Sequence, residues 1–167
     1  MTDTTNDRAE FLRCYGGVYE RSPWVAERCY EQARGISDPE RLANLFARCV
    51  DQADEETRLA LIRAHPDLAD RAAIAGELGA ASSKEQQSAG IDRCTPEEYQ
   101  RFQDLNRRYK EKVGFPFVMA VRDSSREEIL AAFEARLENT RETEFVNALS
   151  EIHKIARLRL QADSNGQ

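Results

Sequence analysis

The sequence has little of what metal and redox sites usually need. Its 167 residues include only two histidines and four cysteines, and no two cysteines form a CxxC pair: they are Cys14, Cys29, Cys49 and Cys94. A zinc site built from Cys and His is therefore poorly supported, and we expect free, buried thiols in a reducing cytosol. The nucleotide, serine-hydrolase and zinc-protease signatures GxGxxG, Walker A, GxSxG and HExxH are also absent.

Long apolar runs and an excess of basic residues are missing too. No stretch approaches the roughly 18–20 apolar residues of a membrane span, and the first residues show no basic region followed by an apolar one. The 24 Lys and Arg residues are outnumbered by 30 Asp and Glu residues, which gives a net charge of −6. Binding of duplex nucleic acid depends on neutralising phosphates, so we do not expect nucleic acid as the partner. Without a long apolar run we do not expect a membrane either.

What is present indicates a helical globular protein. The length predicts one domain, 1–167, with a core from about residue 8 to 162. Helix-start signals recur along the chain, at Ser22-Pro23, Ser37-Asp38-Pro39-Glu40, Asp54, Thr95-Pro96 with Glu98, and Ser125 with Glu128. No stretch alternates at period two, and Pro116 interrupts the one β-like run, 113–121. The sequence predicts an all-α bundle of seven to nine helices.

His65 is the first candidate for chemistry because of its place in the chain. One predicted helix ends near Ala64. Pro66 disfavours the helical conformation in the residue before it, so the imidazole of His65 projects at a helix junction. Two interpretations stay open, a general acid or base and a structural histidine that caps or bridges two helices. The second histidine, His153, lies on the flank of the last predicted helix, where we expect a surface role.

A polar helix start, Ser82-Ser83-Lys84-Glu85-Gln86, is the second candidate. Ser82 and Glu85 have the spacing of a capping box, which by itself explains both residues. The amides at the same helix start would also suit an anion, and a carboxylate there could orient a polar group of a substrate. Capping and substrate binding both stay open for Glu85.

The run Gly114–Val121 and Arg159 complete the candidates. A proline-interrupted segment leaves backbone groups without helical partners, so it either crosses the core as a connector or binds a flat, hydrogen-bonding ligand. In the last helix, spacing turns Arg159 toward the apolar stripe and Arg157 away from it. An inward guanidinium needs an anion, from the protein or from a ligand. The alternative is a solvated flank with a snorkelling stem.

Taken together, these stretches resemble one family, in its order along the chain. They are Ser22-Pro23-Trp24-Val25-Ala26, Ala64-His65-Pro66-Asp67-Leu68-Ala69, Ser82 to Gln86, Ala89-Gly90-Ile91-Asp92, Phe102 with Leu105-Asn106 and Tyr109, Gly114-Phe115-Pro116-Phe117, and Leu158-Arg159-Leu160. Over about residues 8–162 the chain resembles the 2-oxo-4-hydroxy-4-carboxy-5-ureidoimidazoline (OHCU) decarboxylases of the urate-to-allantoin pathway.

The resemblance implies an all-helical, usually homodimeric enzyme that needs no cofactor and converts OHCU to (S)-allantoin and CO2. We also expect a cytoplasmic protein without a metal site. It implies that His65 is the general acid/base and that Glu85 and Arg159 orient the substrate. It also implies substrate contacts from Pro66, Ser82, Ser83, Lys84, Gln86, Phe117, Val118, Met119, Ala120 and Val121. The alternatives are a non-catalytic helical interaction module, and a lyase or hydrolase that acts on a related ureido acid.

Overall fold

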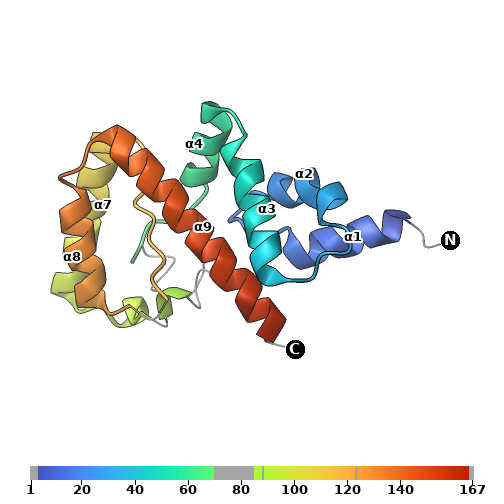
Figure 1. The fold of residues 1–167 in the computed structure, drawn as a ribbon. Coiled ribbons are helices and arrows are strands. Elements are labelled where there is room, and N and C mark those ends of the chain that lie inside the picture. The colour runs from blue at the N-terminus through green and yellow to red at the C-terminus, as the bar shows by residue number, and fades with distance from the viewer. Residues whose placement is uncertain (1–3, 70–84, 88, 123, 166–167) are drawn as a thin grey trace. The chain divides into compact units, whose positions relative to one another are not determined.

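The structure, a computed structural model, describes residues 4–69, 85–87, 89–122 and 124–165, and every regular element among them is helical (Figure 1). These elements are α1 (Thr4–Tyr15), α2 (Trp24–Ala33), α3 (Pro39–Asp51), α4 (Glu55–Arg63), the 3-10 helix η1 (Ile91–Arg93), α7 (Pro96–Val113), α8 (Arg126–Arg136) and α9 (Arg141–Asn165). The predicted all-α fold is confirmed for these residues. None of these helices is long and apolar enough to cross a membrane.

The chain divides into two compact units. The first contains Met1–Ala64 and Ile152–Gln167, and the second contains His65–Glu151, so α9 contributes to both. In the first unit α2 packs against α1 and α3, and in the second α7 packs against α8. The candidate residues His65 and Glu85 belong to the second unit, and Arg159 belongs to the first. One domain over 1–167 stays a prediction.

Most helices begin where the sequence predicts. The capping side chains each accept a hydrogen bond from a backbone N–H in the first turn, and they are Asp38 for α3, Asp54 for α4, Thr95 for α7 and Ser125 for α8. Thr95 and Ser125 also form complete capping boxes with the glutamate three residues later. Local side-chain chemistry therefore sets these boundaries.

The start of α2 differs from the prediction. Ser22 does not cap this helix; its Oγ donates instead to the Glu20 carbonyl oxygen at 3.0 Å. The Ser22 N–H donates to the Tyr19 carbonyl oxygen at 3.1 Å, so residues 19–22 form a tight turn before Pro23. The hydroxyl is used within that turn, which leaves it unavailable to the helix.

The run Gly114–Val121, hereafter the core-crossing segment, passes through the interior of the second unit. It begins at Gly114, whose φ of +84° ends α7 in the left-handed region that glycine tolerates. Phe115, Phe117, Val118 and Val121 are buried, which agrees with the connector interpretation. The Phe117 ring stacks on Phe133 of α8, with centroids 3.9 Å apart. Aromatic packing thus holds an element that has no helical bonds of its own.

Candidate active site

His65 directly follows α4 and begins the second unit. The helix ends at Arg63, Ala64 is its C-cap, and His65 lies outside the helix as Pro66 predicts. The residue is 8% exposed, so the imidazole is held inside the protein rather than on a free surface. A buried histidine at a helix junction is compatible with both interpretations that the sequence left open.

The residues after His65 are held by three side chains on one face of α7. These side chains follow each other at intervals of three and four residues, as neighbours on a helix face do. We call them the α7 polar stripe, and His65–Ala69 the His65 segment. Gln103 Nε2 donates to the Ala69 carbonyl oxygen (2.9 Å), Asn106 Nδ2 to the Leu68 carbonyl oxygen (2.9 Å) and Lys110 Nζ to Asp67 Oδ2 (2.5 Å).

Ala69 connects the His65 segment to Gln86. Its φ of +56° lies in the left-handed region, which is unfavourable for a residue with a Cβ. Both of its backbone groups are bound, because the N–H donates to Gln86 Oε1 at 3.2 Å and the carbonyl oxygen accepts from Gln103. Gln86 is 4% exposed. Gln86 therefore has a structural role, and its contact with substrate stays a prediction.

Glu85 is half-buried next to Gln86, in the helical turn 85–87. Its carbonyl oxygen accepts a hydrogen bond from the Ala89 N–H at 3.3 Å. Ser82, Ser83 and Lys84 lie outside the described residues. The capping and substrate-binding interpretations of Glu85 are both still open.

The core-crossing segment changes exposure along its length. Phe117 and Val118 are buried, Met119 and Ala120 are half-buried, and Val121 is buried again. Within this segment, Met119 and Ala120 are therefore the predicted substrate contacts that are partly open to solvent.

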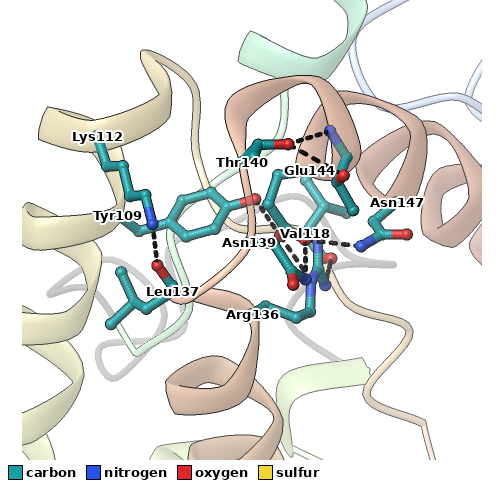
Figure 2. A network of polar contacts seen from close by, with 10 residues as sticks. Tyr109, Lys112, Val118, Arg136, Leu137, Asn139, Thr140, Glu144 and Asn147 are labelled. Atoms are coloured by element: carbon teal, nitrogen blue, oxygen red, sulfur yellow. Dashed lines mark hydrogen bonds and ion pairs between the residues drawn. The ribbon is translucent and has the colours of Figure 1, made fainter.

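A buried carboxylate, Glu144, supports this segment (Figure 2). Glu144 is 0% exposed, and each of its oxygens accepts two hydrogen bonds. Oε1 accepts from the Tyr109 hydroxyl (2.6 Å) and from Arg136 Nε (2.8 Å). Oε2 accepts from Asn139 Nδ2 (3.0 Å) and Asn147 Nδ2 (2.6 Å). These five residues form the Glu144 network.

The network fixes its own protonation states. Burial raises the pKa of Glu144, but hydrogen bonds from Tyr109, Asn139 and Asn147 and the charge of Arg136 outweigh it, so the pKa lies below its usual value. Burial and the bond to the carboxylate raise the pKa of Tyr109 well above the ordinary range. At neutral pH the interior of the second unit thus holds an ionised carboxylate and a neutral phenol.

Nothing in the local sequence marks Glu144 as buried, yet helical spacing offers a signal. Glu144 lies four residues before the buried Ala148 and eight before the buried Ile152, so it falls on the inner face of α9. A carboxylate on that face needs donors, and three of its four come from residues outside α9.

Arg159 lies inside the first unit, and Arg157 lies at its surface. Arg159 is 9% exposed, whereas the Arg157 side chain is 47% exposed and 3.5 Å from Glu40. The inward direction predicted for Arg159 is confirmed. Its anion is Glu20, with Nη2 and Oε2 3.0 Å apart, and Nη1 donates to the Val18 carbonyl oxygen at 3.3 Å.

The prediction for His153 is wrong in part. Its side chain is only 21% exposed; Nδ1 lies 2.8 Å from the Tyr19 hydroxyl and Nε2 lies 3.0 Å from Asp51 Oδ1. The connection between α1 and α2 explains the difference, because Val18, Tyr19 and Glu20 each bind a side chain of α9. The imidazole therefore ties elements together instead of lying on a free flank.

The structure joins some of the candidates directly. The His65 segment and Gln86 are linked through Ala69, and the core-crossing segment belongs to the same unit. Convergence of Arg159 with these residues stays a prediction. Within the described ranges no three His, Cys, Asp or Glu side chains are placed to hold a metal ion.

Comparison with known proteins gives a consistent result. A family model described as OHCU decarboxylase matches residues 4–161. The OHCU decarboxylase of Haloferax volcanii is 45% identical over 154 residues, which covers 92% of this chain and 89% of that protein. The Mus musculus protein of the same name is 37% identical, over 92% of this chain and 86% of its own.

Solved structures agree with this match. A crystal structure of (S)-allantoin synthase superposes with a TM-score of 0.74 at 33% identity, covering 93% of this chain and 50% of that one. An OHCU decarboxylase crystallised in the presence of (S)-allantoin superposes with a TM-score of 0.70 at 22% identity, covering 95% and 98%, which supports the fold. By sequence and fold, this chain belongs to the OHCU decarboxylase family.

Proposed function

We propose that this protein decarboxylates OHCU to (S)-allantoin and CO2 during urate degradation, with His65, Glu85 and Arg159 carrying the chemistry. The observation that supports the reaction most strongly is the family match, which extends over residues 4–161. The resemblance of the sequence to this family implies the three roles, and the three residues stand in the motifs that carry the resemblance.

The substrate explains why these residue types suffice. In OHCU the carboxylate is attached to a carbon next to an imine-like ring carbon. When the bond to the carboxylate breaks, CO2 leaves and the electron pair moves into the ring, which delocalises it. The protein must orient the carboxylate, disperse the developing charge and deliver one proton to one face of the imine-like ring carbon, while the hydroxyl on the carbon that lost CO2 gives up its proton and becomes a carbonyl.

Each residue then has a distinct task. Arg159 binds and orients the anionic substrate; its contacts with Glu20 and Val18 hold the guanidinium in one place. His65 is the general acid/base that moves protons between the substrate hydroxyl, the ring and the new C–H bond. Glu85 accepts a hydrogen bond from a hydroxyl or N–H group of the substrate.

The remaining contacts recognise the flat substrate. Backbone amides in Phe117–Val121 read the edges of the ureidoimidazoline ring, together with Gln86. Two observations support this arrangement: Gln86 is held by Ala69 next to the His65 segment, and Met119 and Ala120 are the half-buried residues of the core-crossing segment. Pro66 and the residues 82–84 complete the contacts.

The protein is further proposed to be a cytoplasmic homodimer that folds as one domain. The family resemblance supports this assignment. Light scattering coupled to size-exclusion chromatography distinguishes the dimer, near twice the mass of the 19.0 kDa chain, from a monomer.

Circular dichroism tests the reaction. Urate is mixed with urate oxidase and hydroxyisourate hydrolase, with and without this protein, and the allantoin signal is followed. We expect rapid appearance of one enantiomer only with the protein, and a helical interaction module predicts no acceleration. Parallel assays with allantoate-like compounds distinguish a lyase or hydrolase of another ureido acid.

The circular dichroism assay also tests the role of Glu85. Glu85→Gln should lower decarboxylase activity more than it lowers thermal stability. A variant that loses only thermal stability would favour the capping interpretation.

A further inference from the structure

The ion pair between Arg136 and Glu144 is buried in the second unit. The Glu144 side chain is 0% exposed and that of Arg136 is 13% exposed, with Arg136 Nε 2.8 Å from Glu144 Oε1. Removing two charges from water is costly, and apolar side chains of similar volume often stabilise a core as well or better. Stability is therefore a weak explanation for the pair, and its contacts suggest another.

Arg136 uses its planar guanidinium on three groups at once. Nε donates to Glu144, Nη1 donates to the Val118 carbonyl oxygen at 2.7 Å, and the guanidinium carbon lies 4.3 Å from the centroid of the Phe117 ring. Phe117 and Val118 are consecutive residues of the core-crossing segment. One side chain thus fixes both a ring and a peptide group of this segment, which a flexible ammonium group would not do.

Glu144 in turn fixes Arg136. Its four donors come from four places in the chain: Tyr109 on α7, Arg136 on α8, Asn139 between α8 and α9, and Asn147 on α9. Both carboxylate oxygens are bound twice, so the carboxylate has one orientation. Figure 2 shows these donors gathered around Glu144, with Val118 close to Arg136.

Fixing the Val118 carbonyl oxygen also fixes the next N–H. The Val118 carbonyl group and the Met119 N–H belong to one planar trans peptide, in which they point in opposite directions. Since the oxygen faces Arg136, the Met119 N–H points away from it, at the start of the half-buried stretch. In the part of the chain that the structure describes, this N–H makes no hydrogen bond.

We infer that Arg136 and Glu144 are positioning residues for the decarboxylation, which aim the Met119 N–H at a hydrogen-bond acceptor of the substrate. Glu144 orients Arg136, and Arg136 sets the plane of the Val118–Met119 peptide. The inference rests on the proposed function, in which Phe117–Val121 contact OHCU. A donor that is aimed before the substrate arrives costs no reorganisation on binding.

The test separates aiming from folding through steady-state kinetics with freshly generated OHCU. A variant that is partly unfolded has less active enzyme, which lowers the apparent kcat and leaves KM unchanged. A variant with a misdirected amide is folded but binds substrate poorly, so KM rises. For Arg136→Met we expect KM to rise about 10-fold or more. For Arg136→Lys we expect a smaller rise, because one ammonium group cannot serve both Glu144 and Val118.

The double variant Arg136→Met/Glu144→Leu keeps the test valid if the single variants fold poorly. It removes both charges together, so no buried charge is left unpaired and the fold is retained. We expect its KM to stay raised although its stability returns. Arg101→Met is the matched control: Arg101 pairs with Glu134 on the exposed face of α7 and α8, and its loss should leave KM within about 2-fold.

Two outcomes contradict different statements. Wild-type KM in the folded double variant would overturn the positioning role and leave the reaction untouched. Absence of OHCU decarboxylation by the wild-type protein would instead overturn the proposed function.

Discussion

Two non-helical segments of the second unit carry proposed substrate contacts, and they are held in different ways. The α7 polar stripe binds the His65 segment with two amides and one lysine, all from a single helix. The Glu144 network holds the core-crossing segment through Arg136, which is paired with Glu144. The carboxylate of Glu144 accepts hydrogen bonds from donors on α7, α8 and α9 and from the connection between α8 and α9. The His65 segment is therefore held by three separate contacts, whereas the hold on the core-crossing segment depends on one buried carboxylate.

The difference teaches how each segment should respond to mutation. The Lys110 and Asp67 side chains are 46% and 24% exposed, so water can replace their contact, whereas Glu144 has no exposure at all. Loss of one stripe contact leaves the other two in place. Loss of the carboxylate leaves a buried guanidinium without its counter-charge, which is far more costly.

The largest effect on stability is expected from Glu144→Leu. Breaking a buried ion pair by removing one partner costs about 3–5 kcal/mol in the free energy of unfolding. Urea denaturation followed by circular dichroism measures this loss. The double variant Arg136→Met/Glu144→Leu should recover most of it, and a double variant as unstable as the single one would contradict the explanation.

A smaller loss is expected from Asn106→Ala, in the α7 polar stripe. The variant leaves the Leu68 carbonyl oxygen without its donor, which costs about 1–3 kcal/mol. The buried Asn106 Oδ1 has no hydrogen-bond partner among the residues that the structure describes, so its removal offsets part of that cost. Chemical denaturation should therefore rank Asn106→Ala below Glu144→Leu, and the opposite order would reverse the comparison.

Acidification should weaken the Glu144 network selectively. The folded pKa of Glu144 is lowered, so its contribution to stability is complete above the unfolded pKa, about 4.3, and is lost as the pH falls through the folded value. The stability difference between wild type and Glu144→Gln should shrink below about pH 4. A difference that stays constant down to pH 2 would show that the carboxylate charge does not stabilise the network.

The smallest effect is expected from Lys110→Met. Its ion pair with Asp67 is half-exposed, and such pairs contribute about 0–1 kcal/mol and are screened by salt. Thermal melts at low and high salt should show a difference from wild type only at low salt. A loss as large as that of Asn106→Ala would mean that the stripe is not divided among independent contacts.

The sequence predicts features that depend on near neighbours. Thr95 and Ser125 cap their helices through bonds to residues three positions later, and Pro66 keeps His65 out of a helix by direct steric exclusion. Arg159 faces inward because helical spacing places it there. In each case the physical cause lies within a few residues of the feature.

Features that depend on distant partners were not predictable in this way. Glu144 is buried because Tyr109, on another helix, supplies a donor 35 positions away. His153 meets Tyr19 only when the connection between α1 and α2 lies against α9. Ser22 looked like a helix cap, but its hydroxyl is used in a turn. Tertiary contacts decide these cases. For Glu144, helical spacing indicates the inner face of α9, but it does not reveal the donors that bind the carboxylate there.

The most direct test is turnover of freshly generated OHCU by His65→Ala, followed as the circular dichroism of the allantoin formed. We predict a fall in kcat of about 10²–10⁴-fold with the helical spectrum unchanged, because the proton donor is lost and the fold is not. Turnover close to that of the wild type by the folded variant would contradict the role of His65 in the decarboxylation.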